Sequence, residues 1–492
     1  MLKINRYNLL RWLSIIVIFI AAGLAVFVLI RYSRIRAGFP SGTKIAGVPV
    51  GGMDQNAAAQ RLNQVFNTPI ELKYGDARIQ VKPSTLGFSI DTVGMIAAAD
   101  QQRVSLPFWS GFWDFLWNRV PSSMDTPIRS SLEEKRLQVF LIDEIAARYD
   151  KVPESSIGVP GTVSFQLGTP GEVLNIEQAI PVVEKTLQNP FQRSVELPID
   201  LIEPPRPSIA NLEIQLKQIL DQSGFDGLTE MYLLDLKSRE ELHFAYENGI
   251  DYRPGIAFTA ASTVKIPIMV SVFRRLSEPT PARALDLMRS MISESNNPPA
   301  DALMNEFIAN NIGPNFVTSD LQELGFSNTF LAGMFYLGAP LLNRYPTPAN
   351  SRLDYTTDPD TYNQTTTNEL GSLLDDIYQC AETGGGSFNI VFPGELSQSE
   401  CQLMIDYLLT NKIGQLLQAG LPDGVKMAHK HGWIVETDGV IHTIIDAGIV
   451  YTSHGNYVIV AAMYQPTQLI YDIANLLQAR LSTAIYNYFN IK

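Results

Sequence analysis

The chain has few cysteines and no excess of basic residues, and both absences exclude classes of function. The only two cysteines in 492 residues are Cys380 and Cys401, and neither lies in a CxxC or a zinc-like Cys/His spacing. A cysteine metal cluster is excluded, while a structural disulfide or two buried thiols stay open. With 50 acidic and 37 basic residues the net charge is −13, which would repel a phosphate backbone. We therefore expect no nucleic-acid partner.

Histidines are scarce as well. Of the five histidines, His429 and His431 form a His-x-His pair, but the next residues supply no third ligand and Trp433 follows. The other three, His243, His442 and His454, are scattered along the chain. We expect neither a metal nor a cofactor.

One long stretch has no charged side chain. It runs nineteen residues from Trp12 to Ile30, about the length that crosses a hydrocarbon core of roughly 30 Å. Because it is longer than a usual signal-peptide core and ends directly in Arg31, we predict an uncleaved membrane anchor, with a cleaved signal peptide as the alternative. Basic residues flank it on both sides and so give no orientation: Lys3, Arg6 and Arg11 before it, and Arg31, Arg34 and Arg36 after it.

The rest of the chain divides at a proline-rich run. Residues 202–207 read Ile-Glu-Pro-Pro-Arg-Pro, which favours extended backbone and ends a preceding element. We predict a tail and anchor over 1–36, a small α+β module over 37–205 and a larger domain over 206–492. The length of the chain agrees with several domains.

The predicted module has short strands, helices and one aromatic segment. Asp54 is a plausible N-cap for a helix, and strand-like alternation follows at 70–74 and 79–81. Trp109, Trp113 and Trp117 recur every four residues, so a helix would place the three indoles on one face. We predict that this stripe belongs to the core; a membrane interface or a glycan contact are the alternatives.

Three short segments carry a resemblance for this module. They are Gly-Val-Pro-Val-Gly-Gly-Met at 47–53, Lys-Tyr-Gly-Asp at 73–76 and Leu-Gly-Phe at 86–88. The region from about 40 to 205 resembles the peptidoglycan-binding domain that precedes catalytic domains in bacterial cell-wall proteins. The resemblance implies wall binding, and a plain spacer is an equally good interpretation.

The last domain has strands at both ends and helices between them. After a helix over about 209–222, a hairpin is predicted from strands at 231–235 and 241–246. Much later come strands at 443–451 and 457–464 and a closing amphipathic helix over about 467–488. The pattern predicts an α/β (α+β) fold: an antiparallel sheet flanked by terminal helices, with an all-helical lobe inserted.

A candidate nucleophile lies at the start of an apolar helix. Ser262 stands three residues before Lys265, and residues at i and i+3 share a helix face. A serine needs an adjacent base to become a nucleophile. A lysine that is desolvated and close to a second cation can serve, because its pKa falls. Alone, Ser-x-x-Lys is a weak signal.

Two further segments strengthen it. Ser295-Asn296-Asn297 and Lys430-His431-Gly432 match the Ser-Asp-Asn and Lys-Thr-Gly motifs, in the same order along the chain. Residues 209–492 therefore resemble the class A β-lactamase-like serine hydrolases of the penicillin-recognising family.

The resemblance implies a role for each matching position. Ser262 would attack the carbonyl of a β-lactam or D-alanyl peptide, and Lys265 would take its proton. Ser295 would pass a proton to the leaving nitrogen, and Lys430 would attract the substrate carboxylate. The remaining substrate-binding positions are Asn297, for the amide side chain, His431 and Gly432, with the backbone N–H groups of Ser262 and Trp433 forming the oxyanion hole.

Departures from the family pattern bear on turnover. Asn296 replaces the usual aspartate and His431 the usual hydroxyl residue, although a histidine can still donate a hydrogen bond. Class A enzymes deacylate with a loop glutamate, but no glutamate occurs from Leu324 to Asn368. Aspartate is shorter, so efficient β-lactam turnover is in doubt. The available carboxylates there are Asp354, Asp358 and Asp360.

The sequence thus predicts a single-pass membrane protein with its serine hydrolase outside the cytoplasm. Its expected partners are a β-lactam or D-alanyl peptide, peptidoglycan and the membrane. The leading hypothesis is β-lactam hydrolysis through a Ser262 acyl-enzyme. A D,D-carboxypeptidase or related wall-peptide hydrolase, or a receptor that stays acylated, are the alternatives.

Overall fold

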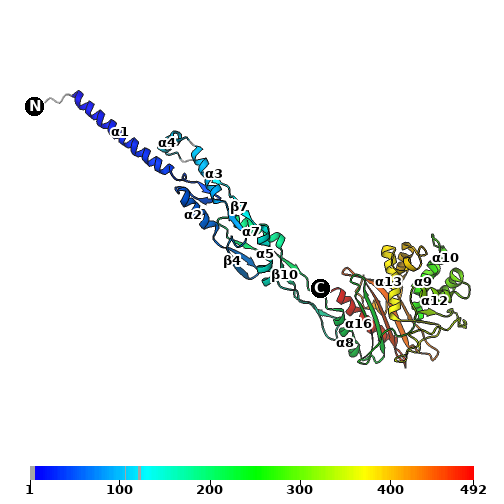
Figure 1. Ribbon diagram of the computed structural model, residues 1–492. Helices are drawn as coiled ribbons and strands as arrows, with labels where there is room; N and C mark the ends of the chain where they lie inside the picture. The colour runs from blue at the N-terminus through cyan, green and yellow to red at the C-terminus, as the bar shows by residue number, and fades with distance from the viewer. Residues whose placement is uncertain (1–5, 106, 120–123, 492) are drawn as a thin grey trace. The chain divides into compact units, whose positions relative to one another are not determined.

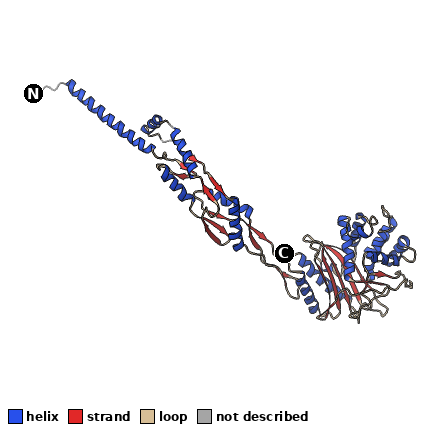
Figure 2. Ribbon diagram, viewed as in Figure 1, coloured by secondary structure: helices blue, strands red, loops and turns tan. Residues whose placement is uncertain are grey.

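The computed structural model describes residues 6–105, 107–119 and 124–491. They divide into two units: unit 1 is Met1–Glu154 with Pro170–Glu203, and unit 2 is Ser155–Thr169 with Pro204–Lys492. Figure 1 labels the elements and Figure 2 separates helices from strands. Both units mix helices with short or antiparallel strands, which confirms the predicted fold class.

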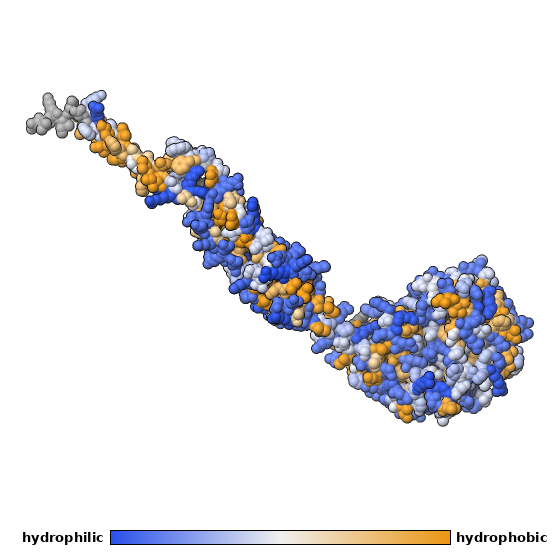
Figure 3. Space-filling model, viewed as in Figure 1, coloured by the Kyte–Doolittle hydropathy of each residue, from blue (hydrophilic) through white to orange (hydrophobic). Residues whose placement is uncertain are grey.

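The first helix, α1 (Arg6–Arg36), contains the predicted anchor. Its segment Leu9–Arg36 is long and apolar enough to cross a membrane, with a mean hydropathy of 3.1 in its most apolar window, and that window is not buried in the protein. Figure 3 shows hydrophobic side chains along it. The described residues contain one such helix. A signal sequence near an N-terminus has the same composition, so length alone does not separate the two.

Unit 1 has a small core of its own beneath short sheets. Helix α2 begins where predicted, because the Asp54 carboxylate accepts the backbone N–H of Ala57 at 2.8 Å. The predicted hairpin is β3–β4, and β11 extends it in parallel on β3. The elements are β1 (Lys44–Ile45), β2 (Val48–Pro49), α2 (Gln55–Phe66), β3 (Ile70–Tyr74), β4 (Ala77–Val81), β5 (Phe88–Ile90), α3 (Thr92–Ser105), α4 (Phe108–Leu116), β6 (Asp125–Thr126), β7 (Ser130–Leu132), α5 (Glu134–Phe140), the π-turn η1 (Leu141–Ala146), α6 (Ala147–Tyr149), β10 (Gly171–Leu174), α7 (Ile176–Gln188), β11 (Ser194–Glu196) and β12 (Ile199–Ile202).

The tryptophan stripe is on a helix, as predicted, but it is not in the core. Trp109, Trp113 and Trp117 are 63%, 58% and 71% exposed, and α4 buries none of its residues fully. The prediction of a core stripe was therefore wrong. The phenylalanines between the tryptophans supply the protein-facing side of the helix, which leaves the indoles outward.

Unit 2 is built on a six-stranded antiparallel sheet in the order β15-β14-β13-β21-β20-β19. The predicted hairpin and closing strands all belong to it, so both ends of the domain meet in one sheet (Figure 1). The strands are β13 (Leu228–Asp235), β14 (Glu241–Glu247), β15 (Ile250–Tyr252), β19 (Lys426–Trp433), β20 (Thr443–Tyr451) and β21 (Tyr457–Tyr464); the shorter ones elsewhere are β8 (Ile157–Gly158), β9 (Phe165–Gln166), β16 (Phe258–Thr259), β17 (Phe330–Leu331) and β18 (Asn363–Thr365).

Helices cover both faces of that sheet. Alternate residues of β13 divide between two cores: Met231 and Leu233 join the core under α8 and α16, while Tyr232 and Leu234 join the core of the helical lobe. Every residue of β13 is buried for this reason. The helices and helical turns are α8 (Ile209–Ser223), η2 (Ala261–Val264), α9 (Lys265–Phe273), α10 (Ala282–Ser293), α11 (Asn297–Leu303), η3 (Met304–Ile308), α12 (Gly313–Glu323), α13 (Thr367–Thr383), α14 (Ser387–Val391), α15 (Gln398–Leu409), η4 (Gln418–Gly420) and α16 (Tyr471–Phe489).

The two cysteines form a disulfide in the helical lobe. Cys380 of α13 and Cys401 of α15 are bridged, and both are buried. The bridge closes the glycine-containing loop between those helices, so the open choice between a disulfide and two thiols is decided for the bridge. Structural disulfides persist in oxidising compartments.

One segment belongs to unit 2 although it lies before the proline-rich run. The hairpin β8–β9 is within residues 155–169, which group with unit 2, whereas the sequence placed them in the module over 37–205. Hydrogen bonds explain the difference. The Gln215 side chain of α8 donates to the carbonyls of Thr162 and Ser164 at 2.8 and 3.0 Å, and Asn487 of α16 donates to that of Val163 at 2.8 Å.

Candidate active site

Ser262 lies in a tight turn against the edge strand of the sheet. The turn is η2, and Ala261 before it has a φ of 47°, a left-handed conformation that costs a non-glycine residue on the order of 1 kcal/mol. Gly432 of β19 makes the close approach: a Cβ there would lie 2.8 Å from the Ser262 nitrogen and the Ala260 carbonyl oxygen. A side chain at position 432 would not fit, which explains the glycine there. Its absence lets β19 and the serine turn lie in contact.

Lys265 connects the serine to the segment that follows α10. Its Nζ is 3.1 Å from Ser262 Oγ, 2.5 Å from the Ser295 carbonyl oxygen and 2.8 Å from Asn297 Oδ1. The lysine is fully buried, whereas Ser262 is partly exposed. Ser262, Ser295 and Asn297 therefore all contact the side-chain nitrogen of Lys265, Nζ. Asn297 contacts it through Oδ1, which accepts a hydrogen bond from Nζ.

Ser295 is held by a second lysine. Lys430 Nζ donates to Ser295 Oγ at 2.8 Å and to the His431 carbonyl oxygen at 3.0 Å. Ser295 itself has a φ of 60°, so its backbone turns sharply before α11 and aims both its carbonyl and its hydroxyl at the lysines. The Ser295 hydroxyl thus lies between the two lysine Nζ atoms, since Lys265 Nζ is 3.5 Å away.

Burial changes the titration of both lysines. Desolvation lowers the pKa of Lys265 from 10.5 to about 8, opposed by the nearby Asp301 carboxylate. Desolvation and then the charge of Lys265 lower the pKa of Lys430 to about 7. A lysine in this range exists partly as the free amine near neutral pH and can accept a proton.

His431 is on the other side of β19 from Lys430, because side chains alternate along a strand. Its ring is stacked on Trp433 with centroids 4.8 Å apart, and its Nδ1 lies 3.2 Å from the amide nitrogen of Asn411. Because Asn411 donates there, the neutral ring carries its proton on Nε2. Desolvation and then Lys430 lower the pKa of His431 to about 3, which makes a protonated ring unfavourable. Nothing in the sequence pointed to Asn411.

The wall beside Lys265 is aromatic, with one carboxylate behind it. The Phe335 ring centroid is 5.5 Å from Lys265 Nζ, and the Phe335 backbone N–H donates to Asp301 Oδ1 at 2.8 Å. Burial raises the pKa of Asp301. Both residues were missed from the sequence. Asp301 on α11 follows the Ser-Asn-Asn segment by one helical turn, which was the available signal.

Two of the three loop aspartates have partners away from the site, and the third is exposed. Asp354 pairs with Arg352 at 2.6 Å, and Asp358 is exposed. Asp360 accepts from the Tyr362 backbone and the Asn363 amide, both at 3.0 Å. None of the contacts described for these aspartates involves Ser262 or Lys265. They are therefore poor candidates for the deacylating group.

One buried group in the described chain has metal-like donors. The donor atoms of His429, His431 and Asp446 lie within 4.8 Å of one another. His429, however, faces an oxygen at both ring nitrogens, Asp446 Oδ1 at 3.0 Å and Gln418 Oε1 at 2.9 Å. Hydrogen bonds thus account for the positions of these side chains, and the group is a poor fit to a metal.

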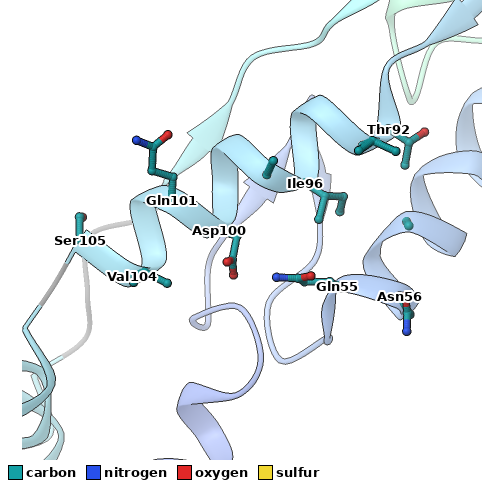
Figure 4. Close-up of a pocket in the computed structure, with 11 residues that line it drawn as sticks. Gln55, Asn56, Thr92, Ile96, Asp100, Gln101, Val104 and Ser105 are labelled. Atoms are coloured by element: carbon teal, nitrogen blue, oxygen red, sulfur yellow. The ribbon is translucent and has the colours of Figure 1, made fainter.

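Unit 1 has a separate open groove between α2 and α3, of about 900 Å³. Figure 4 shows Gln55 of α2 reaching into the space beside α3, whose side includes Thr92, Ile96 and Asp100. Polar and aliphatic side chains are interspersed along the lining. It offers a mixed surface, without a cluster of titratable groups.

Unit 2 brings the Ser–Lys–Ser–Lys cluster together on a fold of the kind that the resemblance to β-lactamase-like serine hydrolases implied. A family model described as β-lactamase enzyme family matches residues 275–489, which confirms the resemblance for that part of unit 2. The match starts after Ser262 and Lys265. A search of curated proteins found no match.

Solved structures of this class are similar to the chain. PBP-A is 22% identical, with a TM-score of 0.41, covering 58% of this chain and 98% of that one. An ancestral class A β-lactamase is 20% identical, with a TM-score of 0.40 and coverages of 56% and 99%. A β-lactamase from Xanthomonas campestris is 16% identical, with a TM-score of 0.39 and coverages of 56% and 98%. The resemblance of unit 1 to a peptidoglycan-binding domain stays a prediction.

Proposed function

We propose that unit 2 forms an acyl-enzyme through Ser262 with β-lactams or D-alanyl peptides. The observation that carries the proposal is the 3.1 Å contact between Ser262 Oγ and a buried lysine whose pKa is lowered to about 8. Ser262 Oγ attacks the carbonyl carbon, and the free amine of Lys265 takes the Oγ proton. Serine then has the adjacent base that it needs.

Collapse of the tetrahedral intermediate breaks the C–N bond. Ser295 gives its hydroxyl proton to the leaving nitrogen and is reprotonated from Lys430, which lies 2.8 Å from its Oγ. A bound carboxylate would raise the pKa of Lys430 again, since opposite charges favour the ammonium form. The N–H groups of Ser262 and Trp433 stabilise the oxyanion. Each such donor is worth about 3 kcal/mol in other enzymes.

The acyl-enzyme is proposed to be long-lived with β-lactams. Hydrolysis needs a base that holds water against the ester, and the side chain beside Lys265 is Phe335, an apolar ring. The Asp301 carboxylate is close enough to counteract part of the lowering of the Lys265 pKa, but it accepts the backbone N–H groups of Phe335 and Tyr336. This favours a D,D-carboxypeptidase, a related wall-peptide hydrolase or a receptor over rapid β-lactam hydrolysis.

We further propose that α1 anchors the protein in a membrane and that unit 2 works outside the cytoplasm. The length and hydropathy of α1 support the first point. The buried disulfide between Cys380 and Cys401 supports the second, because cytosolic thiols are usually kept reduced. Peptidoglycan contact by unit 1 rests on the resemblance of its sequence, and the groove between α2 and α3 is where we would expect it.

The full chain in detergent should be incubated with labelled penicillin, a chromogenic cephalosporin and a D-alanyl-D-alanine peptide. We expect one covalent penicillin adduct by mass, slow colour change and loss of the adduct in Ser262→Ala. Rapid cephalosporin turnover that requires Ser262 would instead establish a β-lactamase. Absence of both adduct and turnover, with peptide cleavage also absent, would refute the nucleophile.

A further inference from the structure

Helix α4 packs one of its faces on the end of α1. Tyr32 of α1 is buried, and its ring centroid lies 5.3, 5.4 and 5.4 Å from those of Phe108, Phe112 and Phe115. The Tyr32 hydroxyl donates to the Phe108 carbonyl oxygen at 3.4 Å, and the Arg36 guanidinium lies 5.2 Å above the Phe108 ring. Both helices belong to unit 1. The place of α4 is therefore fixed relative to α1.

The neighbouring side of α4 has no partner within the described chain that buries it. It presents Trp109, Trp113 and Trp117, all more than half exposed, and Leu116, which is 43% exposed. The remaining side carries Ser110, Gly111 and Asp114, and Asp114 pairs with Arg119 beyond the helix end at 3.7 Å. A helix with an apolar side and a polar side of this kind can lie in a membrane interface. Protein covers only the part of the apolar side that carries the phenylalanines.

The position of α4 along α1 indicates what covers the exposed tryptophans. The uncharged run of α1 ends at Ile30, and Tyr32 is two residues later, about 3 Å further along the helix axis. The contacts of α4 are therefore level with the end of the hydrocarbon-length segment. Arg31 and Arg34, both exposed, are at the same level. Tryptophan rings concentrate at this depth of a bilayer, where an apolar ring and a polar N–H are both accommodated.

We propose that the Trp109–Trp113–Trp117 face of α4 binds the lipid headgroup region of the membrane that α1 crosses. The proposal rests on the anchoring proposed above and goes beyond it, because α4 becomes a second, interfacial attachment. A glycan would also stack on indoles, but the level of α4 beside the end of the apolar segment favours lipid. Arg31 and Arg34 would meet the lipid phosphates there, so anionic lipid should strengthen the contact.

Tryptophan quenching by brominated lipids tests the proposal on the full chain. The five tryptophans are Trp12, the three of α4 and Trp433. In Trp12→Phe, three of the remaining four would lie at the interface, so about three quarters of the emission should be open to quenching. Vesicles with bromine on acyl carbons near the headgroup should quench more strongly than vesicles with bromine near the bilayer centre.

The triple variant Trp109→Ser, Trp113→Ser, Trp117→Ser is the matched control. It keeps Trp12 and Trp433, so it reports insertion of α1 independently of α4. Quenching in the triple variant but none in Trp12→Phe would overturn the inference and leave the anchor intact. Protection of the α4 tryptophans by soluble peptidoglycan fragments, without lipid quenching, would overturn it in favour of glycan. If Trp12 is not quenched either, the anchor and the inference both fail. Acylation of Ser262 is independent of all these outcomes.

Discussion

The active site of unit 2 and helix α4 of unit 1 both place side chains unfavourably, but in opposite ways. Unit 2 buries charged groups, whereas unit 1 exposes aromatic ones. Unit 2 buries two lysines completely, Lys265 and Lys430, and each finds oxygen acceptors within hydrogen-bonding distance. Unit 1 instead exposes three indoles that water solvates poorly. Buried ammonium groups gain reactivity when their pKa falls. Exposure to water gives the indoles of α4 no comparable advantage. We therefore infer that they contact a surface outside the chain, as proposed above for the membrane.

The largest effect is expected from the removal of one buried lysine. Lys265→Ala should slow penicillin acylation by about 10³-fold, because a positioned base is worth roughly that much. Acylation rates by mass spectrometry would measure it, with an exposed lysine of the same domain, Lys426, changed to alanine as the control. An unchanged rate in Lys265→Ala would mean that another group takes the serine proton.

A smaller effect follows from crowding the serine turn. The added methyl group in Gly432→Ala would meet the Ser262 nitrogen at 2.8 Å, so β19 must move away from the turn. Small displacements of reacting groups can slow a reaction by about 10²-fold. Gly414→Ala is the control, because a Cβ there comes no closer than 3.6 Å to other atoms. Equal acylation rates in the two variants would show that the approach is not needed.

The pH dependence should follow the free amine of Lys265. Its pKa is lowered to about 8, so the reactive neutral form is scarce at acid pH and grows as pH rises. The pKa of Lys430 is lower still, about 7, so the charge that attracts an anionic substrate is lost before the Lys265 amine is fully free. Acylation should therefore increase by about tenfold per pH unit below about pH 7, level off between about 7 and 8, and fall above about 8. A rate that does not rise between about pH 5 and 7 would exclude Lys265 as the base.

The smallest effect separates the two faces of α4. Phe112 packs on Tyr32, whereas Trp113 is 58% exposed. Phe112→Ser should loosen α4 from α1 by about 1 kcal/mol, while Trp113→Ser should change it by no more than about 0.5 kcal/mol, as for most surface substitutions. Hydrogen exchange of the α4 amides in detergent would measure both. Equal exchange in the two variants would contradict the assignment of inner and outer faces.

Much of unit 2 could be predicted because its motifs and periodicity are local. The strands at 443–451 and 457–464 are β20 and β21 with the same ends, and α8 differs from its prediction by one residue. The hairpin 155–169 could not be assigned, because its place depends on side chains of α8 and α16 that are distant in sequence. The exposure of the tryptophans was also mispredicted, since helical spacing puts residues on one face without saying which face is buried.

The site residues that lie in sequence motifs were predicted, and those that reach the site only through packing were missed. Ser262, Lys265, Ser295 and Lys430 form a series in which each lies within hydrogen-bonding distance of the next, as their motifs implied. Phe335 was missed, because the segment after β17 brings it to Lys265 and the path of that segment has no sequence signature. Asp301 was missed although α11 places it one helical turn after Asn297. His431 was expected to donate a hydrogen bond to the substrate, and the sequence alone does not give the burial that lowers its pKa.

The hairpin of residues 155–169 also affects how the protein responds to proteases. The chain passes between the units three times, after Glu154, Thr169 and Glu203. A cut after Glu203 would leave a fragment that still carries this hairpin, with Phe165 packed against the core of unit 2 and Val163 bonded to Asn487. One nick would therefore not shed unit 2 from the anchored fragment. Release would also require the hairpin to dissociate.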